Sequence, residues 1–436
     1  MKLVYLTVTM PFGQREPFFI PEVQEMVRQG CQLLIVPRSP EPEVSNRDAE
    51  GLPELAVSRP LVCGEILVAA LQELLRHPIR ALRALGWLFH SRDLKTWLKN
   101  LVAYPKSLWI ARLARQWGAD HIHAQWATVT STMAMVASHV SGIPWSCTAH
   151  RGDIVANNLL AMKMQRAAFF RFIARDGVAT ARALCGEARD GNIVVLHSVV
   201  DMPERVEFRA PLSDPPLLLC VAYLHERKGH KYLFEAVRLL RERGTVVHLQ
   251  LAGDGEARDL LEALVDDAGL RRQVSFLGML GHADLLSIYR SGKVDLAVLP
   301  TLHEGIPAGL LEPMAYGIPV IATNTGGIPE LLEDGVGIMV PPRDPLALAD
   351  AIQRLLGDAS LRRQLAEAGR RRVENGWGVT NVVSTLLEHF SANCAHHAPQ
   401  GGQPHACSDH AGCKDRIASA AKTVPLPPAE DSTSSP

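Results

Sequence analysis

Short apolar runs alternate with helical patterns along most of the chain. Four runs in the first half have the length and composition of buried strands: Val4–Leu6, Gln32–Val36, His121–His123 and Trp145–Thr148. Apolar residues at helical spacing predict helices between these runs, over Pro21–Gln29, Ser107–Trp117 and Thr130–Ser141. Strands that alternate with helices form a parallel sheet covered on both faces, so the pattern predicts an α/β fold.

The pattern restarts after a proline-rich stretch that runs from Pro203 to Pro216. Five further runs are predicted to be strands: Leu217–Ala222, Val247–Ala252, Val274–Phe276, Leu296–Leu299 and Val320–Ala322. We therefore expect two Rossmann-like domains, an N-terminal one over 1–202 and a C-terminal one over 203–375. Ligands of such sheets lie outside the carboxyl ends of the strands, so the cleft between the domains is the expected site.

The periodic pattern ends near Ser391. Residues 391–436 combine His, Cys, Pro and Ser without apolar spacing, and we expect a disordered tail. Its three cysteines and four histidines could instead hold zinc, although their spacing is not that of a usual zinc finger.

Composition narrows the function classes. A chain of 436 residues with 47% hydrophobic and 21% charged residues is typical of a globular protein with two large units. The formal net charge of −1 gives no general attraction to nucleic acid. No apolar stretch approaches the ~20 residues of a membrane span, and Met1–Met10 is too short for a signal-peptide core, so we expect a cytoplasmic protein.

The most informative segment is Leu302–Gly317, which carries two glutamates eight positions apart, Glu304 and Glu312. A buried-strand pattern precedes this segment, and apolar residues at helical spacing follow its first half. Pro313 suits the first turn of a helix, where amides lack internal partners, so the helix is expected to start near Leu310.

The amides of Ile306–Leu311 would then be free to bind an anion, because a helix N-terminus offers unpaired N–H groups and about half a positive charge. Glu304 and Glu312 could accept hydrogen bonds from sugar hydroxyls nearby. The alternative is structural: Glu312 as a first-turn carboxylate stabilised by the helix dipole, and Glu304 as a solvated loop residue.

The flanks of these glutamates favour the first interpretation. Four segments resemble the retaining nucleotide-sugar glycosyltransferases of family 4: His303–Pro307, Leu311–Ala315, Gly317–Ala322 and Thr325–Glu330. The similarity runs from about Val294 to Pro342 and points to the exopolysaccharide and colanic-acid type of member. It implies the GT-B fold, with two Rossmann-like domains facing each other across a cleft and a helix at Gly376–Phe390 that crosses back onto the first domain.

A cation at a junction between strand and helix can hold a departing diphosphate, and Lys228 lies at such a junction. In the resembling family the lysine of a Lys-Gly pair has this role, which maps onto Lys228. An arginine usually lies a few residues earlier, but Val221–Leu224 contains no base. Either Arg227 substitutes for it or phosphate binding is weaker; the alternative for the whole segment is a solvated basic loop.

The resemblance also implies a donor pocket, in which Glu304 accepts from the transferred sugar and Glu312 from the ribose. The remaining donor-binding residues that it implies are Gly305, Ile306, Pro307, Ala308, Gly253, Gly255 and Leu277. The Gly253–Gly255 turn lacks the third glycine of a dinucleotide fingerprint, so that alternative fits poorly.

On the acceptor side the resemblance points to three residues of the first half. His150 follows a predicted strand, and the family has a histidine there that contacts the transferred sugar. Asp153 and Gly13 are further acceptor-side candidates. The alternative for His150 is the commoner one for a lone histidine beside an apolar segment, a satisfied structural residue.

Between Glu65 and Arg115 lie nine bases and three acids, interleaved with Trp87, Trp97 and Trp109. A basic, aromatic, helical face suits an anionic membrane surface, which would make the protein peripheral at the inner face of a membrane. The alternative is an ordinary pair of amphipathic helices packed on the sheet.

The sequence therefore predicts a retaining glycosyltransferase that moves a sugar from a nucleotide diphosphate sugar to a glycan or lipid-linked glycan. Glu304, His150 and Lys228 are its expected catalytic residues. A glycosidase is a poorer fit, because it needs two carboxyls about 5 to 9 Å apart across one bond. Here Glu312 is expected within the helix and Glu304 beyond the start of that helix. No Asp-x-Asp motif is present, so neither a metal nor a cofactor is expected. Another GT-B enzyme, such as a nucleotide-sugar epimerase, and a non-catalytic nucleotide-sugar-binding protein remain alternatives.

Overall fold

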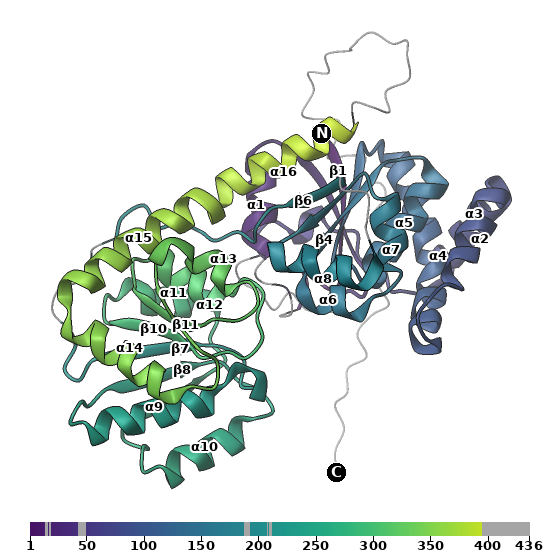
Figure 1. Cartoon of the computed structure of the whole chain (residues 1–436). Helices are drawn as coiled ribbons and strands as arrows, with labels where there is room; N and C mark the ends of the chain where they lie inside the picture. Colours follow the sequence, from purple (N-terminus) through teal and green to yellow (C-terminus); the bar gives the residue numbers. More distant parts are fainter. Residues whose placement is uncertain are drawn as a thin grey trace, which may run out of the picture. The chain divides into compact units, whose positions relative to one another are not determined.

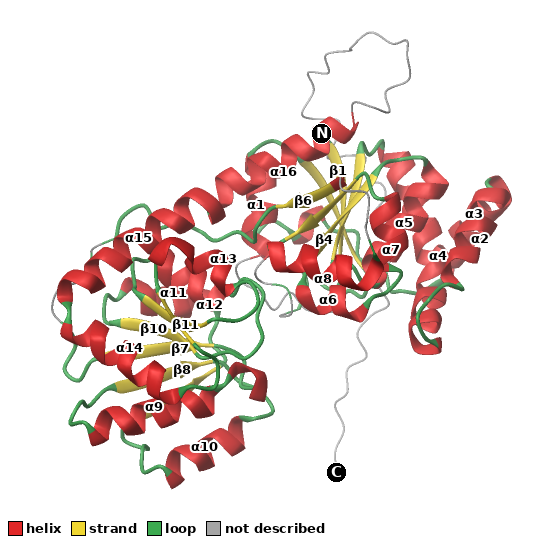
Figure 2. Ribbon diagram, in the orientation of Figure 1, coloured by secondary structure: helices red, strands yellow, loops and turns green. Residues whose placement is uncertain are grey.

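The computed structural model describes residues 1–394 apart from 14–15, 17–18, 42–48, 187–191, 207 and 209–211. Figures 1 and 2 show two parallel sheets, each with helices on its faces. The tail over 395–436, with all but one of the cysteines and histidines of the zinc alternative, lies outside the described residues.

The first sheet has six parallel strands in the order β2-β1-β3-β4-β5-β6. Its strands are β1 (Lys2–Thr7), β2 (Gln32–Pro37), β3 (His121–Gln125), β4 (Trp145–Ala149), β5 (Phe169–Phe172) and β6 (Ile193–Val195). Its helices are α1 (Ile20–Arg28), α5 (Val129–Ser141), α6 (Arg151–Ala156), α7 (Leu160–Arg166) and α8 (Arg175–Cys185). The four predicted strands are confirmed, and β5 and β6 are additions to the sequence prediction.

An insertion of three helices separates β2 from β3. These are α2 (Gly64–Arg76), α3 (Pro78–Leu88) and α4 (Leu94–Trp117). The helix predicted over Ser107–Trp117 is the second half of α4, which begins where the Asp93 carboxylate accepts from the Thr96 amide at 2.7 Å. Proline at 105 lies inside α4, so the sequence pattern recognised only the part that follows it.

The second sheet also has six parallel strands, in the order β12-β11-β10-β7-β8-β9. Its strands are β7 (Leu217–Val221), β8 (His248–Ala252), β9 (Val274–Gly278), β10 (Leu296–Leu299), β11 (Val320–Thr323) and β12 (Ile338–Val340). Its helices are α9 (His230–Glu242), α10 (Arg258–Asp267), α11 (His282–Arg290), α12 (Ala308–Ala315), α13 (Ile328–Leu332) and α14 (Pro345–Gly357). All five predicted strands are present.

The strand order defines where a ligand of the second sheet should bind. From β7 the chain adds β8 and β9 on one side, and then returns to place β10, β11 and β12 on the other side. The order of the strands reverses between β7 and β10, and ligands of open parallel sheets are expected at the carboxyl ends of such a strand pair. The loop after β7 carries Lys228 and the loop after β10 carries Glu304.

The chain ends in two long helices, α15 (Ala359–Trp377) and α16 (Val379–Cys394). The second helix, α16, returns to the first half, where Phe390 contacts Phe169 and His123. The centroid of the Phe390 ring is 5.4 Å from that of Phe169 and 5.2 Å from that of His123. The expected crossover helix thus exists, but it begins at Val379 and not at Gly376. It also continues through Ser391 to Cys394, so the expected start of the tail at 391 lies inside a helix.

A buried ion pair joins β5 of the first sheet to α1. Arg171 and Glu22 are 1% and 3% exposed, and Arg171 Nη1 donates to Glu22 Oε2 at 2.7 Å. Tyr5 and Gln125 donate to the other oxygen of Glu22 at 3.0 and 3.1 Å, so the carboxylate accepts from three side chains. A charge in the middle of β5 is why the sequence pattern did not predict this strand.

Glycines allow the loops of the second sheet to approach its strands. A Cβ on Gly309, in the first turn of α12, would lie 2.4 Å from the Val221 carbonyl oxygen at the end of β7. A Cβ on Gly229 would lie 2.1 Å from the carbonyl oxygen of Pro300, after β10, and its φ of +69° also favours glycine. The start of α12 and the loop after β7 therefore lie against neighbouring strand ends.

Substitution of Gly309 with alanine should push the start of α12 away from β7, because the new methyl group meets backbone and not a flexible side chain. We expect a lower melting temperature, a cost of about 1–3 kcal/mol, and roughly tenfold weaker binding of the nucleoside diphosphate that the family resemblance implies. Differential scanning calorimetry and isothermal titration calorimetry measure the two effects.

Gly357→Ala is the matched control, since Gly357 ends α14 and a Cβ there meets open space. A Gly309→Ala protein that melts and binds nucleotide like the Gly357→Ala protein would contradict the proposed packing of α12 on β7.

Candidate functional site

The loops after β7 and β10 join at an ion pair. Lys228 ends a short 3-10 turn over Glu226–Lys228, and its Nζ donates to Glu304 Oε2. The Lys228 side chain is 24% exposed and the Glu304 side chain 19%, so both can be reached by a ligand. The sequence proposed both residues separately; the structure brings them together.

Backbone hydrogen bonds hold the two loops against each other. The Leu302 amide donates to the Arg227 carbonyl at 2.7 Å, and the Thr301 hydroxyl donates to the same oxygen at 3.2 Å. The loop after β11 supports Glu304 from the other side, because the Gly327 amide donates to the Glu304 carbonyl at 3.3 Å. Backbone contacts thus position the Glu304 side chain independently of its partner Lys228.

The start of α12 is earlier than the sequence predicted. The helix begins at Ala308, capped by Pro307, and the amides of Leu310 and Leu311 donate to the Pro307 carbonyl at 3.0 and 3.2 Å. The expectation that all amides from Ile306 to Leu311 are free is therefore wrong, and Pro307 has no N–H to offer.

Two amides at the start of α12 keep the properties that an anion site needs. Among the described residues, no acceptor lies within hydrogen-bond distance of the Ala308 or Gly309 N–H. The side chain of Ile306 belongs to the core and that of Ala308 is exposed, while a Cβ on Gly305 would meet open space. The helix N-terminus therefore presents backbone rather than side chains beside Lys228.

Glu312 lies one turn further along α12 and is largely buried, with 13% of its side chain exposed. It accepts a hydrogen bond from His282 Nε2, at the start of α11, at 3.1 Å. Burial, followed by the charge of Glu312, raises the pKa of Tyr289 well above its usual value. His282 and Tyr289 were not predicted, because they come from a different strand connection and nothing in the local sequence links them to Glu312.

The turn after β8 owes its glycines to packing. A Cβ on Gly253 would lie 2.0 Å from the Ala222 carbonyl oxygen, and one on Gly255 would lie 2.4 Å from that of Leu224. Both glycines therefore let this turn contact the segment after β7. Leu277, in β9, is half-buried against the core of the second half.

Arg227, the candidate substitute for the missing arginine, has an exposed side chain. Its amide donates to His225 Nδ1 at 3.0 Å, and its positive charge lowers the pKa of Glu256 after larger contributions from hydrogen bonds. Arg227 thus precedes Lys228 in the chain, but among the described residues it is Lys228 that pairs with Glu304.

His150 follows β4 and lies in an aromatic cluster. Its ring is 4.5 Å from that of Trp126 and 5.3 Å from that of Phe19, between ring centroids. Burial, and then Arg171, lowers the pKa of His150 to about 3, so the imidazole is neutral near pH 7. A neutral imidazole can accept or donate a hydrogen bond to a sugar hydroxyl, but it does not offer a positive charge.

Asp153 supports the position of His150 from below. It is 3% exposed and its two oxygens accept from the amides of His150, at 2.6 Å, and Ala127. Burial raises the pKa of Asp153 to about 7, against the lowering effect of these hydrogen bonds. The structure gives Asp153 this structural position, so a direct contact with an acceptor would require these bonds to open.

The predicted acceptor loop after β1 is held by a residue that the sequence did not single out. Glu16 accepts from the amides of Thr9 and Met10 at 2.7 and 2.9 Å, and from Trp126 Nε1 at 2.5 Å. It thereby joins the loops after β1 and β3. Gly13, with a φ of +76°, lies in the same loop, and a Cβ there would meet the Glu41 carboxylate.

The histidines of β3 are not part of this site. His121 and His123 are fully buried, and both contact Ser146 of β4, at 2.8 and 2.7 Å. Burial lowers the pKa of His121 to about 3. These two residues therefore belong to the packing between β3, β4 and α16.

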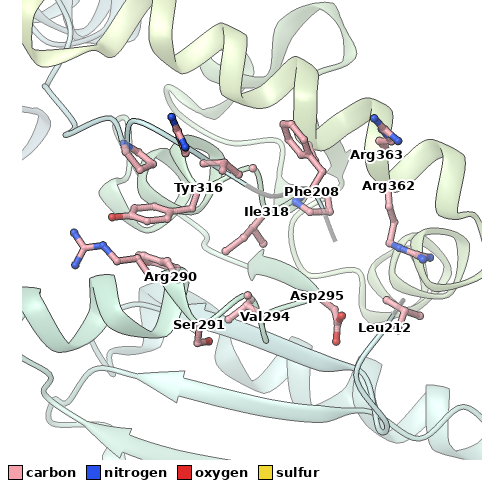
Figure 3. A pocket seen from close by; sticks show the side chains of 18 residues that line it. Phe208, Leu212, Arg290, Ser291, Val294, Asp295, Tyr316, Ile318, Arg362 and Arg363 are labelled. Atoms are coloured by element: carbon pink, nitrogen blue, oxygen red, sulfur yellow. The ribbon is translucent and has the colours of Figure 1, made fainter. Parts of the chain in front are cut away.

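A cavity of about 410 Å³ lies at the opposite end of the second sheet, next to the residues that precede β10 and β11 (Figure 3). The residues that line it include Arg290, Tyr316, Arg362 and Arg363, which Figure 3 labels. Because it adjoins the amino ends of these strands, it is separate from the Lys228–Glu304 pair at their carboxyl ends. Within the described part of the chain, no group of His, Cys, Asp and Glu side chains could hold a metal ion.

Part of this chain is similar in sequence to known proteins. The family model described as "Glycosyl transferases group 1" matches residues 203–372. Alpha-D-kanosaminyltransferase of Streptomyces kanamyceticus is 39% identical over 160 residues, which cover 36% of this chain and 41% of the relative. The lipopolysaccharide core biosynthesis glycosyltransferase LpsE of Rhizobium meliloti is 36% identical over 186 residues, covering 42% and 52%.

A crystal structure of Anabaena Alr3699/HepE in complex with UDP superimposes with a TM-score of 0.66. The superposition covers 90% of this chain and 100% of the Anabaena chain, and the two sequences are 17% identical. This likeness shows the fold. The chain spans about half the length of the curated relatives named above. The segment 203–372, which carries Lys228, Glu304 and Glu312, is therefore similar to the glycosyl transferases group 1 family, within a chain that has the two-sheet GT-B fold.

Proposed function

We propose that this protein is a retaining glycosyltransferase that transfers a hexose-type sugar from a nucleotide diphosphate sugar to a glycan or lipid-linked glycan. One observation carries the proposal: Lys228 of the loop after β7 pairs with Glu304 of the loop after β10, and that second loop leads directly into the N-terminus of α12 at Ala308. A cation and free helix amides suit a diphosphate, and an adjacent carboxylate suits sugar hydroxyls.

The residues divide the work of the transfer. As the bond between sugar and diphosphate breaks, negative charge grows on the phosphate, where Lys228 Nζ and the Ala308 and Gly309 amides stabilise it. Glu304, released from Lys228 by the diphosphate, accepts from hydroxyls of the sugar. Glu312, held by His282, accepts from the ribose. Retention of configuration and these contacts follow from the resemblance to family 4 and are part of the proposal.

The acceptor is assigned to the first half. His150 lies at the end of β4 with a neutral ring, and Arg151 follows it. A Cβ on Gly326, beside the Glu304 backbone, would lie 3.2 Å from Arg151 Nη1, so the loop after β4 approaches the donor loops. A polysaccharide acceptor is favoured by the likeness to a glycosyltransferase of lipopolysaccharide core biosynthesis.

A non-catalytic sugar-nucleotide-binding protein is the second candidate. It is favoured by the absence of a base in Val221–Leu224 and by the exposed side chain of Arg227, which leave Lys228 as the single cation paired with Glu304 in the described loops.

Turnover separates these functions. The protein is incubated with a panel of nucleotide sugars, with and without oligosaccharide acceptors, and products are followed by mass spectrometry. A glycosyltransferase releases nucleoside diphosphate and adds one sugar mass to an acceptor. Isomerised nucleotide sugar without acceptor would indicate an epimerase instead, and binding without any product would indicate the non-catalytic protein.

Glu304→Gln and Glu312→Gln should each lower kcat/KM roughly ten- to more than a hundredfold, because each removes a charged hydrogen bond worth about 1.5–3 kcal/mol. Steady-state kinetics with the donor found above measures this loss. Glu242→Gln, which removes an exposed glutamate of α9 that pairs with Arg238, is the control and should behave like wild type. Wild-type kinetics in both site variants would refute the assignment of these carboxylates.

Turnover should persist in EDTA, because the proposal gives Lys228 and the helix amides the role that a metal ion has in other transferases. The rate is measured before and after dialysis against the chelator. Complete inactivation that magnesium or manganese reverses would show that a metal is required.

A further inference from the structure

The helical insertion between β2 and β3 exposes an unusual amount of apolar side chain. More than half of the large apolar side chains that are exposed in the described part of the chain fall between 62 and 102. Ile79 is 82% exposed, Leu75 73% and Leu94 70%. Isolated exposed leucines are normal on a protein surface, but a concentration of them marks a contact with another body.

These side chains form a stripe on each of the three helices. We call them together the α2–α4 face, and its members are Leu67, Val68, Leu71, Leu75, Ile79, Leu82, Phe89, Leu94, Leu98 and Val102. The spacing of three and four residues along α2 and α4 places each stripe on one side of its helix. The three helices contact one another, as Figure 1 shows.

The other side of each helix is already used by the fold. Ile66 and Ala69 of α2, Ala84 of α3 and Leu108 of α4 are buried in the core of the first half. Tyr104 of α4 donates to the Ala81 carbonyl of α3 at 2.7 Å. The helices are therefore held in place through one side, and the α2–α4 face points away from it.

Six cations accompany the face: Arg76, Arg80, Arg83, Arg92, Lys95 and Lys99. All six are exposed, and within the residues that the structure describes none of them forms an ion pair. The three nearby acids already have partners, since Glu65 pairs with Arg59, Glu73 is buried against Arg115, and Asp93 caps α4 by accepting from the amide and hydroxyl of Thr96. The surroundings of the apolar stripes are thus positively charged.

The structure corrects the sequence interpretation of this region. Lys106 is fully buried and its Nζ donates to the carbonyls of Pro37, Arg38 and Arg59 at 2.6, 2.9 and 2.7 Å. Trp109 is 5% exposed and belongs to the core. The surface is therefore not the predicted mixture of bases and tryptophans. Leucine, isoleucine, valine and one phenylalanine provide its apolar part, and the cations lie on α2, on α3, at the start of α4 and in the loop between α3 and α4.

We infer that the α2–α4 face inserts into the surface of an anionic lipid bilayer. An apolar side of a helix with Lys and Arg beside it is the pattern of segments that lie in the plane of a membrane, about 5–10 Å into its interface. Anionic headgroups would satisfy the six unpaired cations. None of the described helices has the length and apolar character of a membrane span, so the contact is in-plane.

A second copy of the chain is a poorer occupant of the face. Symmetric contact would bring the six cations of each copy together without acidic partners, which opposes association. The inference goes beyond the proposed function and its test does not depend on turnover. If both are correct, the acceptor half of the transferase lies at the membrane that holds a lipid-linked acceptor.

Burial of the α2–α4 face in a bilayer predicts how vesicle binding depends on salt. Purified full-length protein is sedimented with vesicles of phosphatidylglycerol and phosphatidylcholine at low salt and at about 1 M salt, where the Debye length falls to about 3 Å. Wild type should bind at low salt and keep a measurable bound fraction at high salt, because apolar insertion is not screened. Binding that high salt abolishes completely, or no binding at low salt, would overturn the inference.

Four substitutions test the apolar stripes directly: Leu75→Ser, Ile79→Ser, Leu82→Ser and Leu94→Ser in one protein. We expect a more than roughly hundredfold weaker vesicle partition, because four inserted side chains are lost. Leu260→Ser with Leu346→Ser is the matched control, since these leucines are 63% and 53% exposed on α10 and α14 of the second half. Equal binding by the fourfold variant and this control would contradict insertion.

A second variant tests the cations, with Arg80→Gln, Arg83→Gln, Lys95→Gln and Lys99→Gln. It should lose the preference for phosphatidylglycerol over phosphatidylcholine while it keeps the salt-resistant fraction. Hydrogen exchange of the unmodified protein gives an independent readout: amides of α2 and α3 should exchange more slowly with vesicles present. Light scattering that shows a wild-type dimer, converted to a monomer by the fourfold serine variant, would assign the face to self-association instead.

Discussion

The close approach of the two loops at the carboxyl ends of β7 and β10 is the constraint on which the candidate site depends. Gly229 and Gly309 make it possible, because a side chain at either position would collide with a backbone carbonyl of the neighbouring strand end. Once the loops are in contact, Lys228 of one meets Glu304 of the other, and α12 begins at Ala308 in the same loop as Glu304. Packing of backbone against backbone thus places three kinds of ligand-binding group at one point.

The ion pair gives the ligand-free site a definite electrostatic state. Lys228 and Glu304 neutralise each other at partial exposure, so neither charge is left without a partner in a poorly solvated place. In the proposed function, a diphosphate takes Lys228 from Glu304, and the released carboxylate then faces the sugar. On this account, binding of the nucleotide and preparation of the sugar contact are one event. The neutral ring of His150 adds a hydrogen-bonding group without adding charge.

The sequence predicted much of the fold because most strands are apolar runs that end at proline, glycine or a polar loop. It did not predict β5, where the buried Arg171 interrupts the apolar pattern; its partners are Glu22, far away in the chain, and the carbonyls of Leu196 and His197 after β6. It placed Lys228 and Glu304 at strand ends, but their pairing depends on strand order, which local periodicity does not contain. The same holds for His282 beside Glu312. In the helical insertion, apolar residues were visible in the sequence, but which side of each helix faces outward followed only from the packing of α2, α3 and α4.

The most direct test of the account is the affinity of nucleoside diphosphates, without sugar, for three proteins measured by isothermal titration calorimetry. Lys228→Met should bind the preferred nucleoside diphosphate roughly tenfold or more weakly than wild type, because a charged contact to phosphate is lost. Glu304→Gln should bind it at least as tightly as wild type, because the lysine no longer has to leave a carboxylate, although transfer of the sugar falls. Equal weakening of nucleoside diphosphate binding in both variants would contradict the proposed exchange of Lys228 between Glu304 and the diphosphate.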